Sequence, residues 1–275
     1  MSYNTYMRQD NRPIGVFDSG LGGLTVVKEL AKILPHENIV YLGDTARVPY
    51  GPRGVETIKQ FSEENTKFLI KQKVKAVVVA CNTSSAVAAD YLKRKFRKTP
   101  IFEVIKPASI EAAGNGTSIG VIGTRATINS HAYLKNISRV FPHVKVVEKA
   151  CPLFVPFIEE GKTNGKALTI IAEEYLSGLK KQRIGTLVMG CTHYPIIKNI
   201  ISKTVGKNVT LINPGKSVAE EVLVFLKKNN LLNGQEKKGS MNFYVTDLTD
   251  RFRKVAEMFL GKKIDNDLKV ARLTR

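Results

Sequence analysis

Short runs of apolar, mostly β-branched residues alternate along this chain with longer segments in which apolar residues recur every three or four positions. The first pattern predicts buried strands, and the second predicts amphipathic helices. The expected strands are Ile14–Phe17, Ile39–Leu42, Ala76–Ala80, Ile101–Ile105, Ser118–Ile122, Val144–Val147, Thr186–Met189, Val209–Ile212 and Phe243–Val245. The expected helices are Leu24–Leu34, Gly54–Gln72, Ser84–Arg97, Thr127–Val140, Lys166–Lys180, Ile196–Thr204, Ser217–Lys228 and Asp250–Phe259. This alternation is typical of an α/β fold with mostly parallel sheets.

Two sequence motifs recur in the same order in the two halves of the chain. The segment Ile14–Ser19 resembles Ile119–Thr124, and Val77–Thr83 resembles Leu187–Thr192, at a similar spacing in both copies. We interpret this as a weak internal repeat, which predicts two related α/β lobes. Several expected strands end in polar residues, and ligands bind at the carboxyl ends of parallel strands. We therefore expect one small polar cleft between the lobes.

Composition narrows the class of protein. The 275 residues carry a formal net charge of +19, but the basic residues are spread along the chain without a nucleic-acid-binding motif. We therefore expect a solvated basic surface and no nucleic-acid partner. The longest mostly apolar stretch, Ala76–Ala80, is far too short to span a membrane. Residues Met1–Arg12 contain no secretory signal and are expected to be disordered, and the cytoplasm is the default location. The polar segment Asn229–Ser240 is expected to be an exposed loop.

Two of the three cysteines occupy equivalent positions in the repeat. Cys81 and Cys191 each follow an apolar strand and precede the expected start of a helix. The N–H groups and the dipole at a helix N-terminus favour a thiolate. A single buried cysteine is usually inert, but two in equivalent positions favour a function. Cys151 lies in an apolar run and is expected to be structural.

Two thiols on opposite sides of one cleft suit one reaction class better than others. A nucleophilic hydrolase needs one cysteine, and disulfide exchange needs two that touch. Inversion of a carbon stereocentre needs a base on one face and an acid on the other. The cysteine pair therefore favours a pseudo-symmetric racemase.

Other motifs carry weaker signals. Asp18-Ser19 precedes a glycine-rich loop that lacks the third glycine of a dinucleotide fingerprint, since Thr25 stands there. We expect this loop to receive a small ligand, although Asp18 could instead be a mere helix cap. His193 is next to a candidate cysteine motif and can shuttle a proton or hold a carboxylate. No cluster has metal-ligand spacing, and no cue indicates pyridoxal phosphate.

Together these residues strongly resemble bacterial glutamate racemases, of the cofactor-independent aspartate/glutamate racemase superfamily. The resemblance implies two pseudo-symmetric flavodoxin-like lobes with the active site in the cleft between them. Residues 1–105 and 215–275 would form the first lobe, and residues 106–214 the second. The matching segments are Ile14–Thr25, Gly43–Gly51, Ala80–Ser85, Gly120–Thr124, Phe154–Glu159 and Gly190–Pro195.

The resemblance also implies roles for individual residues. Cys81 would remove the α-proton from D-glutamate, and Cys191 would remove it from L-glutamate. Asp18 would assist Cys81, His193 would assist Cys191, and Glu159 would be a further assisting carboxylate. The residues that match the substrate-holding positions are Asp18, Ser19, Tyr50, Gly51, Asn82, Thr83, Thr124, Thr192 and His193.

The implied enzyme needs no cofactor and no metal, and it supplies D-glutamate for peptidoglycan. It would be a cytoplasmic homodimer whose partner is its small-molecule substrate, with no membrane association. Thr192-His193 after the second cysteine favours the glutamate branch. Two alternatives remain open: racemisation of aspartate or a related diacid, and a secondary role in binding DNA gyrase, for which the +19 charge is the motive.

Overall fold

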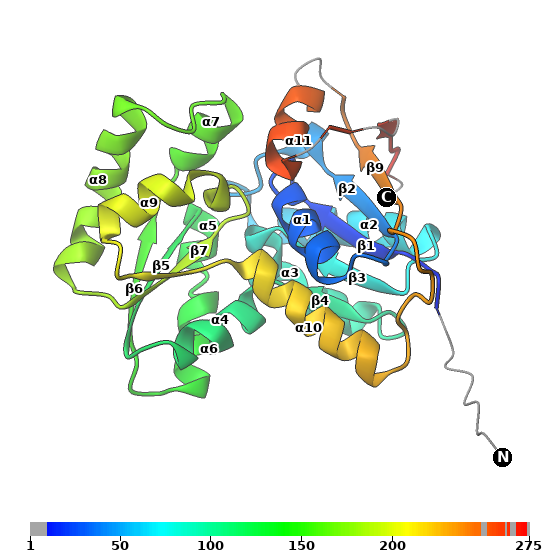
Figure 1. The fold of residues 1–275 in the computed structure, drawn as a ribbon, viewed down its shortest axis with the longest axis horizontal. Coiled ribbons are helices and arrows are strands. Elements are labelled where there is room, and N and C mark those ends of the chain that lie inside the picture. The colour runs from blue at the N-terminus through cyan, green and yellow to red at the C-terminus, as the bar shows by residue number, and fades with distance from the viewer. Residues whose placement is uncertain (1–9, 249–251, 262, 265–267, 274–275) are drawn as a thin grey trace.

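Two parallel β-sheets with helices on both faces form the computed structural model of this chain, which describes residues 10–248, 252–261, 263–264 and 268–273. Within these residues, six strands form the first sheet and four form the second. In spatial order the first sheet is β10 (Lys269–Val270), β9 (Met241–Val245), β2 (Ile39–Gly43), β1 (Ile14–Asp18), β3 (Ala76–Val79) and β4 (Ile101–Glu103). The second is β6 (Lys145–Ala150), β5 (Ser118–Gly123), β7 (Thr186–Gly190) and β8 (Thr210–Ile212). The sheets lie side by side, so the predicted α/β class is confirmed (Figure 1).

The helices and short 3₁₀ turns connect the strands in chain order. The helices are α1 (Leu24–Ile33), α2 (Val55–Lys71), α3 (Asn82–Lys95), α4 (Ile105–Gly114), α5 (Arg125–Asn129), α6 (Ala132–Val140), α7 (Phe154–Glu159), α8 (Lys166–Lys181), α9 (Lys198–Val205), α10 (Pro214–Lys228) and α11 (Phe252–Leu260). The 3₁₀ turns are η1 (Thr45–Arg47) and η2 (Tyr194–Ile197). The expectation of disorder for residues 1–9, and the first two residues of the helix expected from Asp250, lie outside the described residues.

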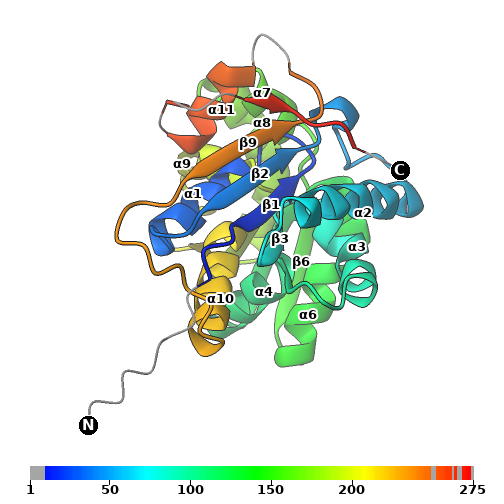
Figure 2. The same ribbon diagram turned by 90° about the vertical axis from the view of Figure 1, so that its right-hand side faces the viewer.

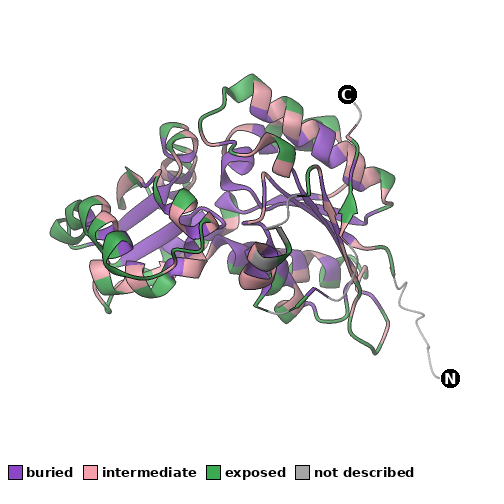
Figure 3. Ribbon diagram, turned by 90° about the horizontal axis from the view of Figure 1, so that it is seen from above, coloured by how far each residue is buried: buried purple, intermediate pink, exposed green. Residues whose placement is uncertain are grey.

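The central strands are apolar on both faces because helices cover both faces. In β1, Ile14 and Val16 belong to the core that includes α1 and α10, whereas Phe17 packs with Leu69 of α2 and Leu92 of α3 on the other face. Side chains alternate between the faces of a strand, so a strand buried on both sides is apolar throughout. Figure 3 shows the central strands of both sheets as buried and the outer faces of the helices as exposed.

The internal repeat has a counterpart in the topology. The order β2-β1-β3-β4 in the first sheet has the same form as β6-β5-β7-β8 in the second. β1 and β5 are thus equivalent, as are β3 and β7. Figure 2 shows β9 beside β2, where it extends the first sheet beyond the part that the second sheet matches.

Several details differ from the predicted elements, and helices α4 and α7 and strand β10 were not predicted. The helix expected over Thr127–Val140 is two helices, α5 and α6, because His131 between them has a left-handed backbone (φ +54°). The strand expected to continue to Ile105 ends at Glu103. The carboxylate of Glu103 accepts hydrogen bonds from the N–H groups of Ile105 (2.7 Å) and Lys106 (2.9 Å), and thereby caps helix α4, which the sequence analysis did not predict.

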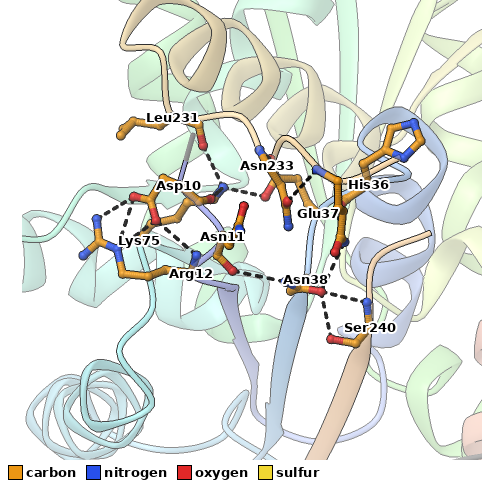
Figure 4. Close-up of polar contacts among 11 residues, drawn as sticks. Asp10, Asn11, Arg12, His36, Glu37, Asn38, Lys75, Leu231, Asn233 and Ser240 are labelled. Carbon is orange, nitrogen blue, oxygen red and sulfur yellow. Dashed lines mark hydrogen bonds and ion pairs between the residues drawn. The ribbon is translucent and has the colours of Figure 1, made fainter. Parts of the chain in front are cut away.

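A buried ion pair joins distant segments at the end of the first sheet where β3 begins. The Lys75 ammonium lies 2.6 Å from the carboxylate of Glu37 and donates to the carbonyl oxygens of Asp10 and Leu231, both at 2.7 Å (Figure 4). Glu37 also accepts from the N–H of Asn233. Residues 229–240 form the predicted loop, but Asn233 is buried, so the loop is not exposed throughout.

Candidate active site

The carboxyl ends of the central strands bring the candidate residues together. Asp18 is the last residue of β1 and pairs with Gly43 of β2, while Cys81 lies two residues beyond β3. In the second sheet Gly123 of β5 pairs with Gly190 of β7, so Thr124 and Cys191 leave neighbouring strands at the same edge. Both sheets therefore present short polar residues to the space between them.

This space contains a cavity of about 300 Å³ that both cysteines line. The cavity also touches all the predicted substrate-holding residues except Asp18, together with Glu159. Its wall consists of Ser19, Val48, Pro49, Tyr50, Gly51, Pro52, Cys81, Asn82, Thr83, Thr124, Arg125, Pro152, Val155, Pro156, Glu159, Cys191, Thr192 and His193. Several of these residues have short hydroxyl or amide side chains, which provide hydrogen-bond donors for a small anionic ligand.

Cys81 is a buried thiol at the N-cap of α3. It lies 3.5 Å from the Ser19 hydroxyl, which can accept a hydrogen bond from the thiol. Burial raises the pKa of Cys81 to about 11, the negative charge of Asp18 adds to this, and hydrogen bonds from Ser84 and Ser19 act in the opposite direction. The helix N-terminus thus favours the thiolate, as expected, but desolvation outweighs it and the pKa rises.

Cys191 belongs to a chain of polar contacts with His193 and Glu159. The Cys191 sulfur lies 3.8 Å from Nδ1 of His193, whose Nε2 lies 3.0 Å from Oε1 of Glu159. Burial lowers the pKa of His193, but its contacts with Cys191 and Glu159 outweigh burial and raise this pKa to about 10. The edge of the Phe259 ring packs on the imidazole with ring centroids 5.2 Å apart. The arrangement favours a fixed imidazolium beside the second thiol.

Asp18 is fully buried and does not line the cavity. Its carboxylate accepts from the N–H of Gly20 at 3.0 Å and from the Thr192 hydroxyl at 3.5 Å. Burial raises the pKa of Asp18, although the charge of His193 and hydrogen bonds from Gly20 and Gly23 oppose this. Asp18 thus lies behind the cavity wall, where it acts on Cys81 through charge and on Thr192 through a hydrogen bond.

The glycine-rich loop between β1 and α1 allows the two sheets to approach closely. A Cβ atom on Gly22 would lie 2.2 Å from the Thr192 hydroxyl and 2.5 Å from Nδ1 of His193. A Cβ atom on Gly23 would lie 2.4 Å from the Cβ of Asp18. These glycines therefore make room for the side chains of the site.

The segment 44–52 carries Tyr50 and Gly51 to the cavity. Buried polar groups hold Tyr50: its hydroxyl donates to the Asp44 carboxylate and accepts from Nδ2 of Asn65 at 3.1 Å. Arg47 donates to Asp44 at 2.7 Å, and its guanidinium lies 4.0 Å from the centre of the Phe61 ring. The Tyr50 hydroxyl is thus engaged within the protein, and the segment is fixed by a network on the side away from the cavity.

Two further residues of this region were not expected from the sequence. Thr25 donates to the carbonyl oxygen of Thr192 at 2.8 Å and so joins the start of α1 to the Cys191 segment. Arg125, exposed at the start of α5, adds a cation to the cavity wall. Two features of the sequence could have indicated them: Thr25 carries a hydroxyl at the end of the glycine-rich loop, and Arg125 directly follows Thr124.

Two further properties bear on the class of protein. Among the residues that the structure describes, no group of three or more His, Cys, Asp or Glu side chains is placed to hold a metal ion. Over the same residues, every helix is too short or too polar to cross a membrane.

Comparison with known proteins gives consistent matches over most of the chain. A family model described as Asp/Glu/Hydantoin racemase matches residues 14–222. A glutamate racemase from Geobacter metallireducens is 44% identical over 262 residues, which cover 94% of this chain and 97% of the relative. One from Thermoanaerobacter pseudethanolicus is 46% identical over 264 residues, covering 95% and 98%. The crystal structure of glutamate racemase from Francisella tularensis in complex with D-glutamate matches with a TM-score of 0.91 at 45% identity, covering 96% of this chain and 98% of that one.

Proposed function

Because this chain belongs to the Asp/Glu/hydantoin racemase family, we propose that it interconverts L- and D-glutamate with two thiols and no cofactor. The observation that carries this proposal is that Cys81 and Cys191, from equivalent strands of two similarly ordered sheets, line the same cavity. One thiol can then reach each face of a substrate carbon held between them.

The reaction is a pair of proton transfers at the α-carbon. A thiolate on one side removes the α-proton and becomes a thiol, leaving a carbanion. The thiol on the other side donates its proton to the opposite face and becomes a thiolate. Cys191 removes the proton from L-glutamate and Cys81 from D-glutamate. Each turnover leaves the enzyme with the proton on the other sulfur, and either the reverse reaction or proton exchange with solvent restores the starting state.

The neighbours of the two thiols divide the acid and base roles. With its pKa raised to about 11, Cys81 is a thiol at neutral pH and can donate to a carbanion. The imidazolium of His193, held by Glu159, stabilises negative charge on the sulfur of Cys191. Asp18 acts on Cys81 from behind the cavity wall. This asymmetry gives a resting enzyme with one acid and one base.

The carbanion needs stabilisation because the α-proton of an amino acid is a very weak acid. Fixed donors around the substrate carboxylates, in a cavity that excludes water, can provide it. Asn82, Thr83 and Thr124 line the cavity with donors of this kind. Thr83 of α3 and Thr124, the N-cap residue of α5, lie 3.0 Å apart, oxygen to oxygen, and belong to segments associated with different sheets, so the substrate would contact both.

Isotope incorporation tests the substrate and the reaction type together. The purified protein is incubated with L-glutamate in deuterium oxide without any added cofactor. We expect D-glutamate that carries deuterium at the α-carbon. Retention of L-glutamate without exchange would overturn the proposal, and a parallel panel of aspartate and other amino-acid enantiomers would identify a different substrate.

Substitution of each cysteine tests the two-thiol mechanism. Cys81→Ala and Cys191→Ala should each lower kcat/KM by at least about a hundredfold in both directions, because each turnover needs both thiols. Cys151→Ala is the matched control, since Cys151 is buried but does not line the cavity, and it should keep its activity. Full activity in either of the first two variants would contradict the mechanism.

We also propose the lobe boundaries, the compartment and the oligomeric state that the resemblance implies. The first lobe would comprise residues 1–105 and 215–275, and the second residues 106–214, with the substrate between them. The protein would act as a cytoplasmic homodimer that supplies D-glutamate for peptidoglycan. Three unpaired cysteines support a reducing compartment. Sedimentation of the purified protein would test the dimer, since a single monomeric species would contradict it.

A further inference from the structure

A buried tyrosine outside the cavity touches one of the residues that line it. Tyr133, on α6, has no exposed surface, and its hydroxyl donates to Oδ1 of Asn82 at 2.6 Å. Asn82 is the first residue of α3 and directly follows Cys81. The hydrogen bond thus connects a helix that packs on the second sheet to the residue beside a candidate catalytic thiol of the first.

This contact determines which end of the Asn82 amide is available to a ligand. An asparagine side chain has one carbonyl oxygen, which accepts, and one NH₂ group, which donates twice. Tyr133 engages the oxygen, and among the described residues no protein group accepts a hydrogen bond from the Asn82 NH₂. Asn82 lines the cavity. The NH₂ group is therefore the polar end that remains for the substrate.

The opposite orientation of the amide would harm binding. A flip would turn the amide oxygen toward the space that the substrate occupies, where it would face a carboxylate. Two acceptors in contact repel, so a bound carboxylate disfavours this orientation. The two orientations have nearly the same shape, so only hydrogen bonding distinguishes them. The orientation in which Tyr133 donates to Oδ1 is the one that leaves the NH₂ group for the carboxylate.

The position of Tyr133 is itself tightly constrained. A Cβ atom on Gly190 would lie 3.0 Å from the Tyr133 ring and 2.6 Å from the carbonyl oxygen of Ile122, so glycine is needed there. Gly190 directly precedes Cys191, which means that the ring packs against the backbone leading to the second thiol. Burial, together with the charges of Glu103 and Cys191, raises the pKa of the Tyr133 hydroxyl well above its ordinary value. The phenol therefore stays protonated and can donate to Oδ1 of Asn82.

From this geometry we propose that Tyr133 is a positioning residue, which holds the Asn82 amide with its NH₂ group toward a carboxylate of the bound substrate. This inference rests on the proposed function for the identity of the substrate. Tyr133 does not line the cavity and acts only through Asn82. Tyr133 also contacts the backbone at Gly190, directly before Cys191. It therefore links the position of Asn82, beside the first thiol, to the position of the second thiol.

Kinetics in a double-mutant cycle test the coupling. Tyr133→Phe should raise KM for glutamate and lower kcat/KM roughly tenfold, because one substrate-facing donor is no longer fixed. In an Asn82→Ala background the same substitution should have no further effect on kcat/KM. Tyr91→Phe, which removes a half-buried phenol from the outer end of the same helix α3, is the matched control and should keep wild-type kinetics.

The cycle separates positioning from a merely structural role. If Tyr133→Phe lowers the free energy of unfolding but leaves KM and kcat unchanged, the inference is overturned. It is also overturned if the effects of Tyr133→Phe and Asn82→Ala on kcat/KM multiply independently.

A measurement without substrate makes the test independent of the proposed function. The side-chain amide signals of Asn82 in a ¹⁵N NMR spectrum are identified by their loss in Asn82→Ala. Tyr133→Phe should shift and broaden them, because the amide gains a second orientation, whereas Tyr91→Phe should not. Unchanged signals would overturn the inference while leaving the proposed function in place. Altered signals in a protein that does not racemise glutamate would support the positioning role and overturn the proposed function.

Discussion

At the scale of single residues, His193 shows how contacts set the charge of a side chain. Burial alone would favour the neutral imidazole, yet the sulfur of Cys191 and the carboxylate of Glu159 on its two ring nitrogens favour the imidazolium. Asp18 is a third group that interacts electrostatically with this ring: burial raises the pKa of Asp18, and the His193 charge opposes this. These charges make the histidine a fixed cation at neutral pH.

This raised pKa predicts a dependence of stability on pH. A group whose pKa is near 6.5 in the unfolded chain and about 10 in the fold stabilises the protein fully below pH 6.5 and ceases to do so as the pH rises through 10. The free energy of unfolding should therefore fall between pH 6.5 and pH 10, by on the order of a few kcal/mol. In His193→Gln this decrease should be smaller.

Urea denaturation at pH 6.5 and pH 9.5 measures the difference. His143→Gln, which alters an exposed histidine, is the control and should follow the wild-type pH dependence. If the free energy of unfolding falls by the same amount between pH 6.5 and pH 9.5 in the wild type and in His193→Gln, the assigned charge state of His193 is refuted.

At the scale of elements, the loop between β1 and α1 brings the two sheets into contact. Gly22 lies against Thr192 and His193, and Thr25 donates to the carbonyl oxygen of Thr192. The loop has no room for a side chain at Gly22, so the identity of this residue is fixed by the distance between the two sheets. Local backbone conformation does not require it, since Gly22 is not among the glycines with positive φ.

Gly22→Ala should therefore inactivate the protein. The added methyl would lie 2.2 Å from the Thr192 hydroxyl, and the resulting displacement of Thr192 and His193 should lower kcat/KM about a hundredfold. Gly178→Ala is the control: Gly178 lies inside α8 with no atom within 4 Å of the added Cβ. It should raise the free energy of unfolding by about 0.5–1 kcal/mol without a change in activity. Wild-type kinetics of Gly22→Ala would show that the loop can move aside.

At the scale of the whole molecule, Lys75 connects segments that are far apart in sequence. Its ammonium binds Glu37 and the carbonyl oxygens of Asp10 and Leu231, so the start of the described chain and the connection from α10 to β9 are held to the sheet (Figure 4). The pair lies before β3, whereas Cys81 follows β3. The ion pair is thus separated from the cavity by the length of β3.

Removal of this ammonium should be costly for folding and neutral for catalysis. Lys75→Met leaves the Glu37 carboxylate buried without its counterion, and should lower the free energy of unfolding by about 3–5 kcal/mol. Lys59→Met removes the lysine of an exposed pair with Glu56 and should cost less than about 1 kcal/mol. Urea denaturation compares the two variants. If both variants lose a similar small amount of unfolding free energy, the buried ion pair contributes little to stability. If folded Lys75→Met has a lower kcat than the wild type, the ion pair is not independent of the site.

Sequence patterns could predict much of this fold because its elements are locally encoded. Apolar runs such as Ala76–Val79 are buried on both faces and are recognisable without any partner. The repeated motifs located Cys81 and Cys191 at equivalent strand ends, and the cavity lies where such ends meet. The helix α4 and the break at His131 escaped prediction, since a side-chain cap by Glu103 and a single left-handed residue leave no periodic signal.

The α/β class, the strand ends and the residue types that could perform proton transfer follow from the amino-acid order, because each depends on neighbours along the chain. The place of Asp18 behind the cavity, the burial that keeps Cys81 protonated and the contact of Tyr133 with Asn82 follow from the folded structure. These properties depend on desolvation and on distances between residues far apart in sequence. Such quantities arise only when the two sheets pack together, so no local pattern can encode them.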